Sequence, residues 1–212
     1  MSDRQDVFVF GASGHGKVVI DAIERAGAHR VVFVCDDAKE KHGTQIMGYT
    51  IIGGRDALLA RRDGPRTGIV GIGDNAIRTK LADWLVQQGY GLAAVVHPHA
   101  AVGRDVEIGD GTVVMAGCVI NTGARLGRNV ILNTGATVDH DCEVEDGVHI
   151  APGSHLCGHV SVGAMTLIGA GTTIIPAVRV GRGVVIGAGS TVLGDIPEGA
   201  RVGGSPCRPL VS

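Results

Sequence analysis

Between residues 96 and 197 the hydrophobic positions recur at a fixed interval of six. From Val96 to Val192 every sixth residue is aliphatic, and four residues after each comes a small or β-branched residue. An α-helix repeats every 3.6 residues and cannot keep this interval in register, whereas a fixed short period is typical of repeat architectures. The pattern therefore predicts a solenoid over residues 96–197.

One repeat shows how the chain is expected to run. In Ala136-Thr137-Val138 the outer two side chains share one face, because strand side chains alternate, so they point inward and Thr137 points outward. Asp139-His140-Asp141 must then turn the chain. The residue directly after the aliphatic one is often Gly, Asn or Asp, and we expect it to supply the positive φ of a tight corner. Each hexad is predicted to be a short strand plus a corner, stacked coil on coil.

The first 95 residues lack this interval and alternate between strand-like and helix-like segments. Strands are predicted at 7–10, 31–34, 49–54, 69–72 and 92–95, helices at 17–23, 56–60 and 76–88, and a polar loop at 61–67. This order predicts a small Rossmann-like α/β domain over 1–95, followed by the parallel β-helix over 96–197. A Gly- and Pro-rich C-terminal loop is expected over 198–212.

Three polar loops follow the expected C-terminal ends of strands in the first domain. They are Ser13–His15 within a glycine turn, Asp36–Asp37, and Gly73–Asn75. Ligands of open α/β sheets bind at this edge. The glycines at 11, 14 and 16 do not match the dinucleotide fingerprint, but backbone N–H groups there are placed to hold a phosphate. A plain structural turn is the alternative interpretation.

Composition narrows the class of partner. The 212 residues carry 19 Lys+Arg and 21 Asp+Glu, a net charge of −2, and no basic block favours nucleic acid. No apolar run approaches a membrane span, and the first six residues do not resemble a signal peptide. Five cysteines without CxxC spacing predict free thiols, with Cys118 and Cys142 in the core. We expect a cytoplasmic protein that binds neither nucleic acid nor membrane.

The hexads resemble those of the left-handed β-helix acyltransferases. With the segments GASGHGKVV (11–19), IGDNAIR (72–78) and VDHDC (138–142), the whole chain resembles the PglD/NeuD-type sugar acyltransferases. It is most similar to enzymes that N-acetylate the 4-amino group of nucleotide-linked 4-amino-4,6-dideoxy sugars, such as bacillosamine-pathway and perosamine N-acetyltransferases. The resemblance implies a left-handed parallel β-helix with eighteen residues per coil. It also implies a homotrimer with acetyl-CoA between neighbouring prisms, a nucleotide-sugar on the N-terminal domain, and no metal.

The resemblance also implies site residues. The catalytic pair falls on His140 and Asp141, although relatives often carry Glu at the second position. An outward His140 could accept a proton near pH 7, and the adjacent carboxylate could hold its tautomer. The implied nucleotide-sugar contacts are Ser13, Gly14, His15, Asp36, Asp37 and Gly73, and the implied acetyl-CoA contacts are His149, Ala170 and Ala188. Asp36 could equally be a turn or helix-cap residue.

Competing interpretations stay open at this point. A γ-carbonic-anhydrase-like metalloenzyme is one, because His140, His149, His155 and His159 lie within twenty residues. Asp141 and His159 should stack about 4.8 Å apart, but His149 and His155 should lie on different faces. The other interpretations are a sugar O-acetyltransferase acting on a sialic acid or related sugar, and a non-enzymatic nucleotide-sugar sensor. The outward Val113, Ile131, Leu167 and Val185 would be exposed on a single prism, which favours a trimer.

Overall fold

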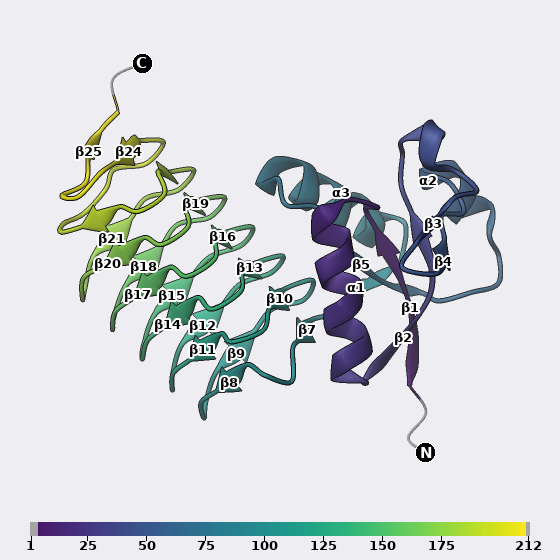
Figure 1. The fold of residues 1–212 in the computed structure, drawn as a ribbon, viewed down its shortest axis with the longest axis horizontal. Helices are drawn as coiled ribbons and strands as arrows, with labels where there is room; N and C mark the ends of the chain where they lie inside the picture. The colour runs from purple at the N-terminus through teal and green to yellow at the C-terminus, as the bar shows by residue number, and fades with distance from the viewer. Residues whose placement is uncertain (1–3, 211–212) are drawn as a thin grey trace. The chain divides into compact units, whose positions relative to one another are not determined.

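The computed structural model describes residues 4–210 and divides the chain into two compact units, Met1–His97 and Pro98–Ser212. Figure 1 shows the first unit as a small sheet with helices and the second as a stack of coils that runs from teal to yellow along the chain. No helix in the described part of the chain is both long enough and apolar enough to span a bilayer.

The first unit is built on a four-stranded parallel sheet with the order β2-β1-β5-β6. Its core joins the two long strands, where the rings of Phe8 and Phe33 stack with centroids 5.8 Å apart and Tyr90 meets Phe8 edge-on. The elements of this unit are β1 (Gln5–Phe10), α1 (Gly14–Ala26), β2 (His29–Cys35), the 3-10 helix η1 (Lys39–Lys41), β3 (Gln45–Ile46), β4 (Tyr49–Thr50), α2 (Arg55–Ala60), β5 (Thr67–Val70), α3 (Asn75–Gln87), β6 (Gly91–Leu92) and β7 (Val95–Val96).

Local sequence explains where these helices begin and end. Helix α1 turns Val19, Ile20 and Ile23 to the core and ends at Gly27, whose φ of 70° provides a left-handed C-cap. Helix α3 begins after Asp74, whose Oδ1 accepts a hydrogen bond of 2.9 Å from the N–H of Ile77.

Two strand predictions in this unit need correction. The strand expected over 49–54 is only two residues long, and Ile51 continues it as an isolated bridge to Val34. The closing strand expected over 92–95 ends at Leu92, and β7 lies outside the four-stranded sheet. Helix η1 was not expected, because its short Lys-Glu-Lys run carries no apolar periodicity.

The second unit is a three-faced parallel β-helix. The first face has the order β25 (Arg208–Pro209), β24 (Arg201–Gly203), β22 (Val185–Ile186), β19 (Leu167–Ile168), β16 (His149–Ile150), β13 (Ile131–Leu132), β10 (Val113–Val114). The second face has β23 (Thr191–Val192), β20 (Thr173–Ile174), β17 (His155–Leu156), β14 (Thr137–Val138), β11 (Val119–Ile120), β8 (Ala101–Val102). The third face has β21 (Arg179–Val180), β18 (Ser161–Val162), β15 (Glu143–Val144), β12 (Arg125–Leu126), β9 (Glu107–Ile108).

The six-residue pattern gives the register of this unit. Residues eighteen positions apart pair between coils, as Thr137 does with His155. Every aliphatic hexad position from Val114 to Val192 is buried, which confirms the predicted interior. Val102 in the first coil is 44% exposed, since that coil has a neighbouring coil on one side only.

The corner prediction placed the positive φ at the wrong residue. Positive φ occurs at the third residue after the aliphatic one, in every hexad from Asp105 to Gly189. The glycines directly after the aliphatic residue serve close packing instead. A Cβ on Gly169, for example, would lie 2.5 Å from the backbone nitrogen of Ala188 in the next coil. Glycine is favoured at the third residue after the aliphatic one because of its positive φ, and at the first because there is no room for a Cβ. The residue type alone therefore does not show which of the two positions has the positive φ.

Two further expectations are wrong. The tail over 198–212 is not only loop, because β24 extends the first face in parallel with β22 and β25 pairs antiparallel to β24. Val113 and Ile131 are buried to 1% and 0% within one chain, so they do not form an exposed outer patch. Other residues of the same chain cover them. Leu167 and Val185 are half-buried.

Candidate active site

His140 and Asp141 lie at the corner between the second and third faces, between β14 and β15. His140 Nδ1 is 2.9 Å from Asp141 Oδ2, and the two side chains are 48% and 53% exposed. Because the carboxylate can only accept, this contact places the imidazole proton on Nδ1 and leaves a lone pair on Nε2. The pair therefore presents a base in the form that can take a proton.

The charges around His140 favour its protonated form. The hydrogen bond to Asp141 raises the pKa of His140, desolvation opposes the rise, and the charges of Asp139 and Asp141 add to it. Asp139 is fixed in turn, because its Oδ1 accepts from the N–H of His140 at 2.8 Å and from Asn121 Nδ2 at 2.7 Å. These two hydrogen bonds lower the pKa of Asp139, and the bond from the His140 N–H has the larger effect. His140 thus lies between two carboxylates.

His159 joins this pair from the next coil. Its Nε2 is 3.7 Å from Asp141 Oδ2, which confirms the predicted stacking, and its ring meets the His140 ring edge-on with centroids 5.1 Å apart. Asp141 and His159 both have the left-handed backbone of this corner, with φ of 56° and 60°. Non-glycine residues adopt that conformation at a cost, but it is shared by the other corners of the solenoid and does not mark this one.

These three side chains are also the one group in the described chain whose geometry could hold a metal ion, and all three are exposed. The other two histidines of the metalloenzyme interpretation lie elsewhere. His149 is on the first face, 3.2 Å from Asn133 Nδ2, and His155 is on the second face, 3.0 Å from Thr137 Oγ1. They lie on different faces, as predicted, so the four histidines form no single metal centre.

The three residues implied for acetyl-CoA lie on another part of the prism. His149 is a half-buried outward residue of the first face, and Ala170 and Ala188 are exposed at the corner between the first and second faces. Within the described residues the N–H groups of both alanines donate to no protein acceptor. Free N–H groups one coil apart can hold carbonyl or phosphate oxygens, so this corner fits a coenzyme with both.

In the first unit the three predicted loops come together at the carboxyl edge of the sheet. The N–H of Ala12 donates to Asp36 Oδ2 at 2.7 Å, and Ser13 Oγ donates to the carbonyl of Gly71 at 3.3 Å. Ser13 and Gly14 are exposed, and His15 is half-buried at the start of α1. A Cβ on Gly11 would lie 2.8 Å from the Gly71 oxygen, so the glycine turn also serves close packing.

Asp36 holds the loop that follows β2 through several hydrogen bonds. Besides Ala12, its carboxylate accepts from the N–H of Ala38 at 2.9 Å and from Lys41 Nζ at 3.0 Å. Burial raises the pKa of Asp36, but the bonds from Ala12, Ala38 and Lys41 outweigh it and leave the pKa lowered. These are the contacts of a turn residue, and a contact from Asp36 to the nucleotide-sugar stays a prediction.

Asp37 lies beside a surface pocket of about 440 Å³, a size common for small-ligand sites. Its Oδ1 accepts from the N–H of Arg55 at 3.1 Å, and the Arg55 side chain is 3.5 Å from Oδ2. Lys39, His42 and Arg55 also line this pocket. The sequence analysis did not select these three residues. Lys39 and His42 belong to a basic run after Asp37 that was an available signal, whereas nothing local marked Arg55.

Gly73 is held in place by the side chain of Arg78, the last residue of the IGDNAIR segment. Arg78 is 1% exposed, and its guanidinium donates to the carbonyls of Gly73 and Ile72 at 2.9 and 3.3 Å and to Asn75 Oδ1 at 2.9 Å. Burial lowers the pKa of Arg78 to about 10, against the opposing charge of Asp74. Arg78 thus fixes the loop that presents Gly73.

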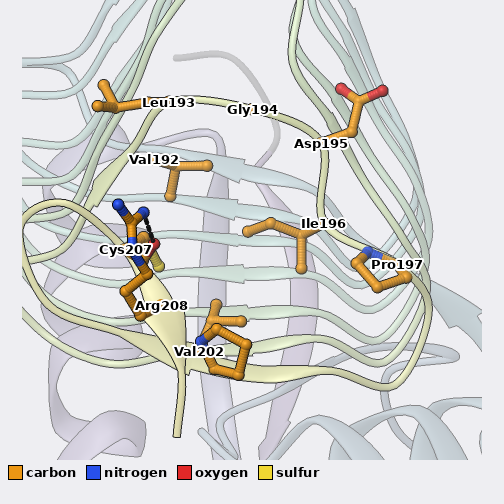
Figure 2. Close-up of a pocket in the computed structure, with 10 residues that line it drawn as sticks. Val192, Leu193, Gly194, Asp195, Ile196, Pro197, Val202, Cys207 and Arg208 are labelled. Atoms are coloured by element: carbon orange, nitrogen blue, oxygen red, sulfur yellow. Dashed lines mark hydrogen bonds between the residues drawn. The ribbon is translucent and has the colours of Figure 1, made fainter.

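A second pocket, of about 320 Å³, opens at the C-terminal end of the prism (Figure 2). Val192, Ile196 and Val202 of the last coil lie inside it, and Arg208 donates to the carbonyl of Cys207 at its edge. Gly194 is on the loop that crosses one side. This pocket is in the last coil, whereas His140 is three coils earlier along the same corner.

Two family profiles match the chain. The profile of the PglD N-terminal domain matches residues 6–85, and the profile of six bacterial transferase hexapeptide repeats matches residues 159–194. The first match covers most of the α/β unit and the second covers coils of the solenoid. Together they support the predicted order of a Rossmann-like domain and a left-handed β-helix.

Solved structures match over nearly the whole chain. The acetyltransferase domain of PglB from Neisseria gonorrhoeae FA1090 is 37% identical, with a TM-score of 0.89 over 98% of this chain and 100% of that one. The perosamine N-acetyltransferase from Caulobacter crescentus is 35% identical, with a TM-score of 0.93 over 98% of this chain and 97% of that one. The latter is a variant with one histidine changed to asparagine, in complex with CoA and GDP-perosamine.

Among curated proteins, the UDP-N-acetylbacillosamine N-acetyltransferase of Bacillus subtilis (strain 168) is 34% identical over 112 residues. This match covers 53% of this chain and 52% of that protein, so it spans about half the length of the curated relative.

Proposed function

Because the chain belongs to the family of hexapeptide-repeat sugar N-acetyltransferases with a PglD N-terminal domain, we propose that it acetylates the 4-amino group of a nucleotide-linked 4-amino-4,6-dideoxy sugar. Acetyl-CoA supplies the acetyl group as a thioester. The observation that carries the proposal is the exposed His140–Asp141 pair, with Nδ1 bonded to the carboxylate.

The chemistry requires a base at the sugar amine. The neutral amine bonds to the thioester carbon, and His140 Nε2 accepts the proton that the nitrogen loses. Asp141 holds the Nδ1–H and stabilises the imidazolium that forms. The carbon–sulfur bond then breaks, and His140 returns the proton to the departing thiolate. The products are the N-acetylated sugar and CoA, and the reaction balances without a metal.

We assign the nucleotide-sugar to the loops of the first unit. Ser13, Gly14 and His15 lie at the start of α1, and the N–H groups of a helix N-terminus suit a phosphate. The pocket beside Asp37 adds Lys39 and Arg55, whose positive charges suit a diphosphate. In this assignment Asp36 holds the loops in place, and Arg78 holds the loop that presents Gly73.

Replacing Asp37 by Ala should raise KM for the nucleotide-sugar several-fold and leave KM for acetyl-CoA nearly unchanged. The physical reason is that Asp37 contacts Arg55 in the first unit and none of the residues assigned to the coenzyme. Steady-state kinetics with each substrate varied in turn would measure this. An equal rise in both KM values would contradict the assignment of this pocket to the nucleotide-sugar.

We also propose that the active unit is a homotrimer. Within one chain the catalytic pair is at the corner between the second and third faces, while Ala170 and Ala188 are at the corner between the first and second. The whole second face separates the two corners. A neighbouring prism that brings its first corner to the His140 corner would complete the site, and a closed three-fold ring repeats this contact without a free edge.

Sedimentation velocity of the purified protein at micromolar concentration is expected to show a single trimeric species. Dilution until the trimer dissociates should remove activity, because each monomer then lacks half of its site. A fully active monomer would overturn the trimer proposal and leave the chemical proposal standing.

We place the enzyme in the cytoplasm, where acetyl-CoA and nucleotide-sugars are available. All five cysteines are free, and a reducing compartment keeps thiols in that state. Burial raises the pKa of Cys142 to about 11, so this thiol is a core residue rather than a nucleophile.

The direct test of the function is acetyl transfer to a panel of acceptors. The panel contains UDP- and GDP-linked 4-amino-4,6-dideoxy sugars, their 4-hydroxy counterparts, and sialic acid. We expect CoA release and N-acetylated product with an amino sugar only. Transfer to the hydroxyl acceptors instead would support the O-acetyltransferase interpretation, and binding of nucleotide-sugar without any transfer would support the sensor.

A further inference from the structure

The imidazole of His140 rests against a residue without a side chain. Gly158 follows His140 by one coil of eighteen residues and occupies the same corner position. A Cβ built on Gly158 would lie 2.5 Å from Nε2 and 2.6 Å from Cε1 of His140, well inside van der Waals contact. The ring therefore fills the space that any other residue would need for its side chain.

The backbone at Gly158 does not itself require glycine. Its φ is not among the positive values of the chain. Other corners of the solenoid carry alanine at the same hexad position, namely Ala116, Ala164, Ala170 and Ala188. The backbone conformation at this corner position therefore accepts alanine. The three atoms nearest to a Cβ at position 158 all belong to the His140 ring.

We propose that Gly158 is a positioning residue for the acetyl transfer, because its missing Cβ provides the space in which the His140 imidazole lies with Nδ1 on Asp141 and Nε2 open. This inference rests on the proposed function, in which His140 is the base. In this inference the missing side chain of Gly158 acts through His140.

Two side chains hold the ring in its observed position. Asp141 holds Nδ1, and His159 lies edge-on to the ring. The Asp141 carboxylate is itself confined, since a Cβ on Gly123 in the preceding coil would lie 2.7 Å from its Oδ1. A methyl group at position 158 would occupy the space beside Nε2, so it would both cover the proton-accepting nitrogen and push the ring off Asp141.

The expected damage is to catalysis rather than to folding. The atoms in the way belong to the free end of an exposed side chain, which can rotate away without moving the backbone. Misplacing a catalytic group by about 1 Å can cost on the order of 10²-fold in rate. We expect Gly158→Ala to lower kcat at least about 10-fold and to leave KM for acetyl-CoA within about twofold.

The chain offers a matched control at Gly194. This residue occupies the same corner position two coils further on, and a Cβ there would meet nothing within 4 Å. Figure 2 shows it on the loop between Leu193 and Asp195. Gly194→Ala makes the same chemical change in the last corner, which is a bend without the positive φ of the earlier corners, and should leave kcat within about twofold of the unmodified enzyme, since no catalytic ring lies against it.

A second readout does not depend on activity. Histidine labelled with ¹³C at Cε1 allows the pKa of His140 to be followed by NMR, with the signal assigned by its loss in His140→Ala. The bond to Asp141 raises this pKa, so a displaced ring should show a lower value in Gly158→Ala and an unchanged one in Gly194→Ala. A His140 pKa and kcat that both match the unmodified enzyme in Gly158→Ala would overturn the inference.

These outcomes separate this inference from the proposed function. If the unmodified protein transfers acetyl to no amino sugar, the proposed function fails, while the NMR comparison still tests whether Gly158 positions the ring. If the unmodified protein is active and Gly158→Ala is equally active, the role of Gly158 fails alone. Unfolding of Gly158→Ala, seen by circular dichroism, with Gly194→Ala folded, would contradict the claim that only the imidazole stands in the way.

Discussion

Replacing His140 by Ala is expected to lower kcat/KM for the amino sugar by about 10²–10⁴-fold, the usual contribution of a positioned general base. The physical reason is the loss of the one proton acceptor that Asp141 holds with Nε2 free. The side chain is half exposed and packs no core, so the variant should remain folded. Steady-state kinetics in the plateau region of the pH profile would measure the loss.

The control for this variant is binding. Calorimetric titration should give Kd values for CoA and for the nucleotide-sugar close to those of the unmodified protein, because His140 contributes to neither assigned binding region. Full activity in His140→Ala would contradict the assignment and leave substrate positioning as the main source of rate enhancement.

Changing Asp141 to Asn should reduce kcat/KM by less, about 10-fold, because the proton acceptor stays while its charged partner is lost. The sign of the pH effect follows from the geometry. Asp141 raises the pKa of His140, so the base in the unmodified enzyme becomes neutral only at a higher pH. Without that charge the pKa of His140 falls, and the acidic limb of the kcat/KM profile moves to lower pH.

The conservative variant Asp141→Glu also tests whether the negative charge at position 141 raises the pKa of His140. It keeps the charge, so its acidic limb should stay near that of the unmodified enzyme even if a longer side chain lowers the rate. Asparagine is among the residues that tolerate a φ of 56°, so Asp141→Asn should not disturb the corner. An acidic limb that does not move in Asp141→Asn would count against His140 as the titrating base.

The sequence predicted the solenoid in most detail, since a six-residue interval determines both the strand and the side that faces the interior. From Val114 to Val192 each aliphatic position is buried as expected. The stacking of His159 on Asp141 followed from the same arithmetic. Periodicity of this kind survives in the sequence because each hexad must satisfy the same packing condition.

Contacts that depend on the three-dimensional packing rather than on the six-residue repeat could not be predicted. The motif IGDNAIR was recognised, but nothing in it shows that Arg78 is buried and bonded to the Gly73 carbonyl. The sequence also does not show that the Asp36 carboxylate accepts hydrogen bonds from Ala12, Ala38 and Lys41. The contact between Gly158 and the His140 ring could not be predicted either. The chain has 35 glycines, and nothing in the sequence distinguishes the one at position 158.

The eighteen-residue register has a consequence for how this chain can tolerate insertions and deletions. Removing one hexad after His140 would rotate every later residue by one face, so His149 would leave its face and Gly158 would no longer follow His140 at the same corner. Removing a whole coil restores the faces but brings a different residue next to the imidazole. A deletion within the prism therefore keeps the faces in register only when it removes a whole coil of eighteen residues, whereas a point substitution changes the surroundings of His140 without shifting any coil.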